Sequence, residues 1–145
     1  MEIIVETQTK LPKLERIGKN LKTKLPRILD SIGAYMEASV VETFEAQGRP
    51  QPWVKNAPST LKRKRGSMIL HESGMLRAGI THWVEDEAVY IGPSGPSLAY
   101  ARIQKKGGVT GRGYATVIPA RDYLVVQVDD NTCIISMIRR EVLDG

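Results

Sequence analysis

The fold is decided by one stretch, PRILDSIGAYMEASVVETFEAQ, residues 26–47. Apolar and small side chains recur in it every three or four residues, which is the spacing of one face of an α-helix. This face consists of Ile28, Leu29, Ile32, Tyr35, Met36, Ser39, Val40, Thr43 and Phe44. Pro26 suits a first helical position, and Gly48 suits a helix stop. We therefore expect a helix of about six turns that forms the spine of the core.

Upstream, the same spacing continues through Leu11, Leu14, Ile17, Leu21 and Leu25. Because proline lacks an N–H and clashes with the preceding helical turn, Pro26 predicts a break near Lys24 and Leu25. Residues 2–6 alternate weakly and predict a short edge strand. Residues 1–25 form a basic N-terminal segment, since residues 10–27 hold seven Lys or Arg and one Glu.

Downstream, residues 48–58 contain three prolines and predict a loop. Trp53 is expected to anchor this loop on the core, with a binding-site aromatic as the alternative. Ser59 or Thr60 should cap a short helix through Lys62–Arg65, which Gly66 ends. This cationic cluster indicates a solvated helix face, with nucleic-acid contact as the alternative.

The second half of the chain reads as short elements. Residues 69–77 predict a turn at Ser73 and Gly74. The further expectations are a β-hairpin of residues 80–84 and 88–92, a helix over 97–104, a flexible loop over 107–113 and strands over 114–118 and 123–126. Asp129 or Asp130 should cap a terminal helix that carries Ile134, Ile135, Ile138, Val142 and Leu143 on one face.

These elements predict an α+β fold with one domain over residues 1–145, in which a long N-terminal helix packs on a small antiparallel sheet beside a C-terminal helix. A chain of 145 residues folds without disulfides or metals. The one cysteine, Cys133, indicates a reducing compartment and should be a small buried hydrophobe. Neither a signal peptide nor an apolar run of about 20 residues is apparent, so we expect a cytoplasmic protein without a membrane partner.

The sequence offers little for catalysis. The glycine-rich residues 107–113 lack the Lys-Ser or Lys-Thr of a phosphate-binding loop. His71 and His82 have no zinc-ligand spacing around them, and His71 with Ser73 is too local for a catalytic dyad. We therefore expect no enzyme, no catalytic or metal-binding residues and no cofactor.

Arg121 stands out because it follows Pro119 between two apolar segments. It is either a surface arginine or an interface residue that pins a planar group. Together with the aromatic and cationic loop positions, it gives a set of protein-interface candidates: Trp53, Lys62, Arg63, Arg102, Lys105, Lys106, Arg112 and Arg121.

Four landmarks occur in a fixed order along the chain. They are Gly48–Trp53, Ile69–Arg77 with its Ser73-Gly74 turn, Tyr100-Ala101-Arg102-Ile103-Gln104, and Ile118-Pro119-Ala120-Arg121. In this order, from about residue 26 to residue 143, the chain resembles the phage virion morphogenesis (tail completion) family of tailed phages and prophages. The chain departs from that pattern at Gln104, where the family has a histidine, at Lys105-Lys106, and at Asp122-Tyr123-Leu124.

The resemblance implies a non-enzymatic protein that acts in tail completion or head–tail joining. It implies an oligomeric ring, neck or tail proteins as partners, and a location in the host cytoplasm during assembly or in the virion. The alternatives are a small nucleic-acid-binding protein that uses Lys10–Arg27 and Lys62–Arg65, an enzyme of unrecognised type at His71 and Ser73, and an unrelated interaction module.

Overall fold

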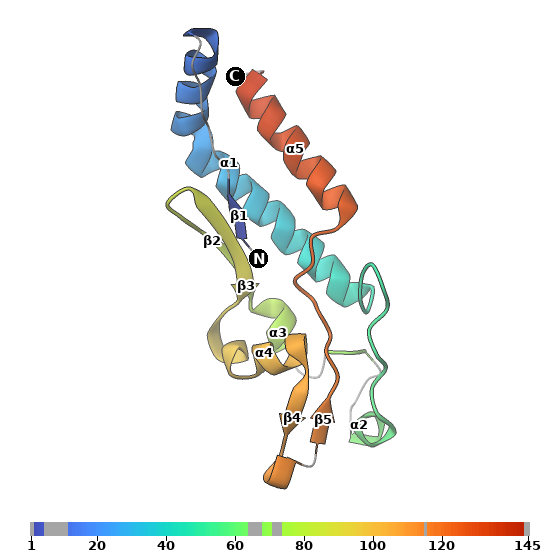
Figure 1. Cartoon of the computed structure of the whole chain (residues 1–145). Helices are drawn as coiled ribbons and strands as arrows, with labels where there is room; N and C mark the ends of the chain where they lie inside the picture. The colour runs from blue at the N-terminus through green and yellow to red at the C-terminus, as the bar shows by residue number, and fades with distance from the viewer. Residues whose placement is uncertain (1, 5–11, 64–67, 71–73, 115, 144–145) are drawn as a thin grey trace. The chain divides into compact units, whose positions relative to one another are not determined.

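The computed structural model describes residues 2–4, 12–63, 68–70, 74–114 and 116–143 (Figure 1). The chain gathers into two compact units. The first unit comprises residues 1–38, 82–91 and 126–145, and the second unit comprises residues 39–81 and 92–125. The long helix α1 (Pro12–Glu45) and the hairpin strands β2 (Ile80–Glu85) and β3 (Ala88–Pro93) contribute residues to both units. The composition of helices and antiparallel strands confirms the α+β class.

Helix α1 is one uninterrupted helix of 34 residues. The predicted break before Pro26 is wrong, because Pro26 lies inside the helix. A proline in a helix interior costs about 3 kcal/mol, but buried side chains before and after Pro26 continue one apolar face, and their packing holds the helix together. The buried hydrophobic residues of α1 are Leu21, Leu25, Ile28, Leu29, Ile32, Met36, Val40 and Phe44. The apolar stripe predicted for residues 26–47 is thereby confirmed.

Helix α1 ends in a left-handed turn at Gln47, whose φ is 59°. The Gln47 N–H donates to the Phe44 carbonyl (3.2 Å), and the Gly48 N–H donates to the Thr43 carbonyl (2.9 Å). These two bonds form a Schellman motif, which satisfies the last helical carbonyls. A Cβ at Gly48, which has φ 114°, would lie 2.5 Å from the Trp53 backbone nitrogen, so only glycine fits. The expected helix stop at Gly48 is confirmed.

The first unit contains a three-stranded sheet in the order β1-β3-β2. Strand β1 (Glu2–Ile4) pairs antiparallel with β3, with Glu2 opposite Tyr90 and Ile4 opposite Ala88. The predicted edge strand and the predicted hairpin are both confirmed. The hairpin turn lies at Asp86, whose φ is 54°.

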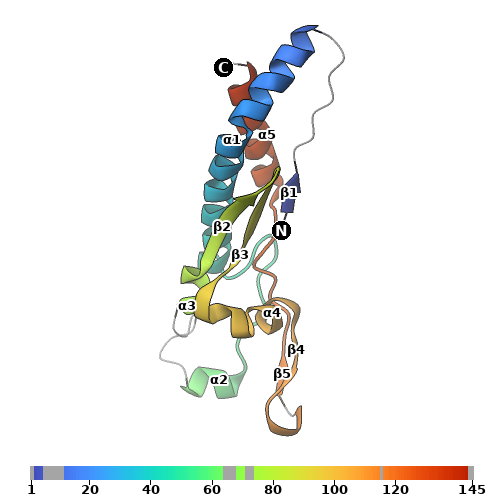
Figure 2. The ribbon, with the colours of Figure 1, turned by 90° about the vertical axis from the view of Figure 1, so that its left-hand side faces the viewer.

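The sheet and the C-terminal helix α5 (Val128–Leu143) both contact α1 within the first unit. The Tyr35 hydroxyl donates to Asp130 Oδ1 (3.0 Å), and Arg27 forms an ion pair with Glu141. Since Arg27 precedes Tyr35 and Glu141 follows Asp130, the two helices run antiparallel, side by side in both views (Figure 1, Figure 2).

Helix α5 begins with a carboxylate cap. Asp130 Oδ2 accepts the Gln127 N–H at 2.8 Å, as the third residue of a helix does in a capping box. Ile134 is buried, but Ile135 and Leu143 are exposed. Cys133 is also exposed, so the expectation of a buried cysteine is wrong. The helical period turns position 133 away from the face that Ile134 buries.

The second unit is assembled from short elements. These are α2 (Pro58–Arg63), α3 (Met75–Ala78), the 3-10 helix η1 (Gly95–Ser97), α4 (Leu98–Lys106), β4 (Gly108–Thr110), the 3-10 helix η2 (Arg112–Tyr114) and β5 (Thr116–Ile118). Helices α2 and α4 confirm the predicted short helices, although Ser59 lies inside α2. The predicted turn residue Ser73 and the expected helix stop Gly66 lie outside the described residues.

Two expectations for the second unit are wrong. The predicted flexible loop over residues 107–113 contains β4, which pairs antiparallel with β5 so that Val109 faces Val117. The predicted strand over residues 123–126 has no strand pairing. The first residue of this apolar segment, Tyr123, instead inserts its ring into the core of the unit, where the residue is 1% exposed.

Candidate interaction surface

Three aromatic rings form the centre of the second unit. The Phe44 ring meets the Trp53 ring edge to face at a centroid distance of 5.5 Å, and it meets the Tyr123 ring at 5.3 Å. The Trp53 Nε1–H donates to the Asp122 carbonyl (3.1 Å), and the Tyr123 hydroxyl donates to the Ala101 carbonyl (2.9 Å). Burial and the charge of Asp122 raise the pKa of Tyr123 to about 12, so the hydroxyl stays protonated as a donor. Trp53 is therefore the expected loop anchor.

Arg121 is buried beside this cluster, with only 7% of its surface exposed. Its Nε–H donates to the Val54 carbonyl (3.0 Å) and its Nη2 donates to the Lys55 carbonyl (3.3 Å). Its backbone N–H donates to the Gln104 carbonyl (3.0 Å). The reading of Arg121 as a surface arginine is therefore wrong. Burial lowers the pKa of its guanidinium, because desolvation disfavours the charged form.

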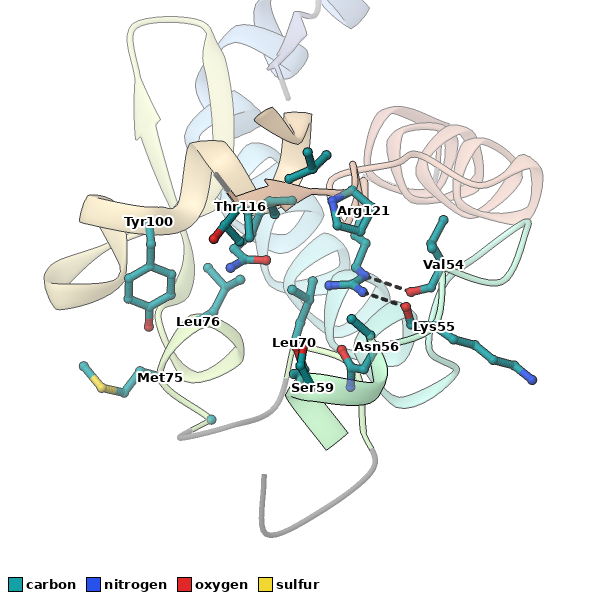
Figure 3. Close-up of a pocket in the computed structure, with 17 residues that line it drawn as sticks. Val54, Lys55, Asn56, Ser59, Leu70, Met75, Leu76, Tyr100, Thr116 and Arg121 are labelled. Atoms are coloured by element: carbon teal, nitrogen blue, oxygen red, sulfur yellow. Dashed lines mark hydrogen bonds between the residues drawn. The ribbon is translucent and has the colours of Figure 1, made fainter. Parts of the chain in front are cut away.

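A pocket of about 780 Å³ opens next to Arg121. All four sequence landmarks border or support it: Trp53 precedes the lining residue Val54, while Leu76, Tyr100 and Arg121 from the other three line it directly. Figure 3 shows Tyr100 and Met75 on one side of the pocket and Val54 and Lys55, which follow the first landmark, on the other. We call this site the Arg121 pocket. Segments far apart in the sequence thus converge on one concave surface.

The Arg121 pocket is apolar and cationic. Large apolar side chains remain exposed around it, namely Val54 (58%), Met75 (42%) and Val117 (76%). Lys55 and Arg121 are the charged residues among the described lining residues, and no Asp or Glu is among them. Such a surface suits a partner that brings apolar side chains and negative charge.

All eight predicted interface candidates belong to the second unit. Lys62, Arg102, Lys106 and Arg112 are exposed. Lys105 is half-buried and pairs with Asp122 (3.1 Å), while Trp53 and Arg121 are buried. Arg63 ends α2, and its side chain lies outside the described ones. Arg102 and Lys106 also border a shallower depression of about 450 Å³ next to Gly107. Their role in an interface stays a prediction.

The charges of the chain are divided unequally between the units. The second unit holds twelve Lys and Arg against four Asp and Glu, which gives +8, and the first unit holds nine against twelve, which gives −3. Three of the four acids in the second unit already form ion pairs: Glu42 with Arg49, Glu45 with Arg77 and Asp122 with Lys105. Among the side chains that the structure describes in this unit, most cations therefore form no ion pair with an acid of the unit.

Sequence reasoning missed the pocket itself. Val54, Lys55 and Val117 carry no motif, and only the proximity of the landmarks in space brings them together. It also missed the stacked pair of Trp83 and Tyr90 on the sheet of the first unit, whose ring centroids lie 5.6 Å apart. The alternation of strands β2 and β3 contained a signal for this pair, because cross-strand neighbours of a hairpin share one face.

The catalytic alternative named His71 and Ser73, and both lie outside the described residues. Among the described residues, no group of His, Cys, Asp and Glu side chains is suited to hold a metal ion. Within the same part of the chain, no helix is both long and apolar enough to cross a bilayer.

The fold and the Arg121 pocket define an α+β protein with an apolar and cationic pocket. A model described as the phage virion morphogenesis family matches residues 5–143, and the chain belongs to this family. The match includes most of the basic N-terminal segment, which the sequence resemblance had left out. The protein therefore acts in the assembly of phage particles, in contact with other phage structural proteins.

A curated relative is similar over most of its length. It is the Mu-like prophage FluMu G protein 2 of Haemophilus influenzae, which is 31% identical over 126 residues, 87% of this chain and 83% of the relative. No solved structure matches the chain significantly.

Proposed function

We propose that this protein completes the tail or joins head and tail during phage assembly, and that it acts through protein–protein contacts without catalysing a reaction. The observation that carries this proposal is the family match over residues 5–143. The Mu-like prophage origin of the relative supports it. Neck and tail proteins are the proposed partners, and the host cytoplasm and then the virion are the proposed locations.

The proposed form is a ring of identical subunits. A ring arises when one surface of a subunit binds a different surface of the next subunit. The opposite net charges of the two units, −3 and +8, supply complementary surfaces for such a contact, since complementary potentials guide association. Native mass spectrometry of the purified protein should therefore give a closed oligomer that dissociates as salt is added. A monomer at all concentrations would contradict the ring and leave the joining role intact.

Deletion of the gene from the phage or prophage tests the joining role. We expect electron micrographs of the lysate to show filled heads and separate or unfinished tails, and we expect the wild-type gene in trans to restore complete particles. Complete, infectious particles from the deletion strain would contradict the proposed function.

Nucleic-acid binding is the second candidate, and one observation favours it. Arg16, Lys19 and Lys22 are exposed along the first turns of α1, and no carboxylate forms an ion pair with them among the described residues. If they bind phosphates, the DNA affinity should fall steeply with salt, and Lys19→Glu should reduce that slope. Absence of a gel shift at about 50 mM salt would remove this candidate.

A further inference from the structure

We propose that the Arg121 pocket binds an extended, acidic and apolar segment of another virion protein, which adds as a strand to the free edge of β5 and places a carboxylate next to Arg121. This inference rests on the proposed function, because it names the chemistry of a partner in the same assembly.

The first observation is the free edge of β5. In the described sheet, β5 pairs with β4 alone, from Gly108 opposite Ile118 to Thr110 opposite Thr116. Four consecutive residues, 116–119, line the pocket. Successive side chains of a strand point to opposite faces, so a run of four places the pocket along the backbone edge. Unpaired N–H and C=O groups on such an edge are a template for an added strand.

The second observation is apolar surface on both sides of this edge. Val117, on β5 itself, is 76% exposed, and Val54 and Met75 across the pocket are 58% and 42% exposed. An added strand directs alternate side chains to either side, where these residues can bury them. Burying these side chains would favour binding, because apolar surface is removed from water.

The third observation is the uncompensated charge of Arg121. Two of its guanidinium nitrogens donate to the Val54 and Lys55 carbonyls, and no carboxylate of the described residues lies within ion-pair distance. A buried charge without a counter-charge is costly. A carboxylate from the partner would offset that cost through charge-assisted hydrogen bonds. Lys55 at the same wall favours the same charge, which makes the partner acidic.

A binding assay with the full-length protein tests the site directly. The probe is a short fluorescent peptide of alternating valine and glutamate, compared with matched peptides that carry glutamine or lysine in place of glutamate. Fluorescence anisotropy should show binding of the glutamate peptide, and an affinity for the glutamine peptide lower by about tenfold or more. Equal affinities for the three peptides, or displacement of the glutamate peptide by a single-stranded oligonucleotide, would overturn the proposal.

Exposed variants separate binding from folding, because Arg121 also holds the loop at Val54. Val117→Asp places a negative charge on the free edge, and Val109→Asp, its cross-strand partner outside the pocket, is the matched control. We expect Val117→Asp to lower the affinity for the glutamate peptide by about tenfold or more. Val109→Asp should leave the affinity for this peptide unchanged. Lys55→Glu should lower the affinity for the glutamate peptide as well, whereas Lys106→Glu should not. Equal effects of a variant and its control would contradict the site.

The same variants distinguish this inference from the proposed function. In the gene-deletion strain, Val117→Asp should fail to restore complete particles while Val109→Asp restores them. If Val117→Asp loses peptide binding but restores particles, the pocket is not the assembly contact and the proposed function stands. If the deletion itself leaves particles complete, the proposed function fails whatever the peptide does.

Discussion

Each of the two units is stabilised internally by its own kind of contact. In the first unit, stability comes from regular elements, with α1 and α5 side by side and a three-stranded sheet in register. In the second unit, a few large side chains bind backbone carbonyls of distant segments, as Trp53 does at Asp122 and Arg121 at Val54. Periodic side-chain patterns therefore build the first unit, whereas single landmark residues build the second.

The two tryptophans give the largest test of this comparison. Trp53 is 9% exposed and central to the second unit, while Trp83 is 45% exposed on the sheet of the first. Trp53→Ala should destabilise the protein by about 3–5 kcal/mol. Trp83→Ala should cost about 1 kcal/mol, the value of an exposed aromatic pair. Urea denaturation followed by circular dichroism measures both losses of stability. Equal losses would show that Trp53 anchors the second unit no more strongly than Trp83 supports the first.

The same variants test the prediction of one domain over residues 1–145. Each variant leaves a single tryptophan, so its fluorescence reports on one unit: Trp83 on the first unit and Trp53 on the second. If the chain unfolds as one domain, the Trp83 signal in Trp53→Ala shifts together with the circular dichroism. A Trp83 transition that stays in place would show that the units unfold separately.

Gly33→Ala tests how closely the regular elements of the first unit pack. A Cβ at this position would lie 2.2 Å from His82 Cδ2. Helix propensity alone favours alanine by about 1 kcal/mol, but we expect a net loss of about 1–3 kcal/mol from overpacking. Adding His82→Ala to Gly33→Ala should recover part of the loss. A stabilised Gly33→Ala would show that the helix and the sheet do not approach this closely.

The pH dependence of the first unit gives a smaller effect. Burial would lower the pKa of His82, but the hydrogen bond with Asp30 and the charges of Asp30 and Glu37 outweigh this effect and raise the pKa above its ordinary value. The Nε2 atom lies 3.0 Å from Asp30 Oδ1. The Nδ1 atom also lies 3.0 Å from Glu37 Oε1, where it lacks hydrogen-bond geometry, so this second attraction is electrostatic.

A group whose folded pKa is raised contributes stability that is complete below its unfolded pKa, about 6.5 for histidine, and that disappears as the pH rises through the folded pKa. The protein should therefore lose about 1 kcal/mol between mildly acidic and mildly alkaline pH. His82→Gln should remove this difference. Urea midpoints at the two pH values measure this difference in stability. If His82→Gln shows the same difference between the two pH values as the wild type, the assignment to His82 is contradicted.

The ion pair of Lys105 and Asp122 should give the smallest effect. Their side chains are 30% and 49% exposed, and exposed pairs contribute about 1 kcal/mol or less. Lys105→Gln should lower the urea midpoint slightly at low salt and not at high salt. Lys106→Gln, at the exposed end of α4, serves as the control. A large loss in Lys105→Gln would show that charge pairs, rather than aromatic anchors, hold the second unit.

The sequence was most informative where side chains repeat. The stripe from Ile28 to Phe44 and the alternation in residues 80–92 predicted α1 and the hairpin. The predicted break at Pro26 is wrong because the poor fit of proline in a helix interior is overridden by the packing of the apolar face on both sides of it. The apolar neighbours of position 133 in the sequence suggest a place in the core. The assignment is wrong because Ile134, its buried neighbour, points in a different direction on the helix.

The candidate surface was only partly predictable. The landmarks marked the right segments, since each borders or supports the Arg121 pocket, but their convergence depends on contacts between residues far apart in the sequence. The burial of Arg121 follows from two carbonyls more than sixty residues away, and no local pattern encodes that. Tyr123 shows the same limit, because an apolar run gives a strand or an anchored loop according to what surrounds it.

The exposure of Cys133 has a practical consequence. It is the one cysteine of the chain, and it lies on the surface of α5, so a thiol-reactive gold cluster or spin label can attach at a single known place. Electron micrographs of labelled particles would then locate each copy of the protein. Distances between paired spin labels would report how many copies surround one another, without altering a residue of the second unit.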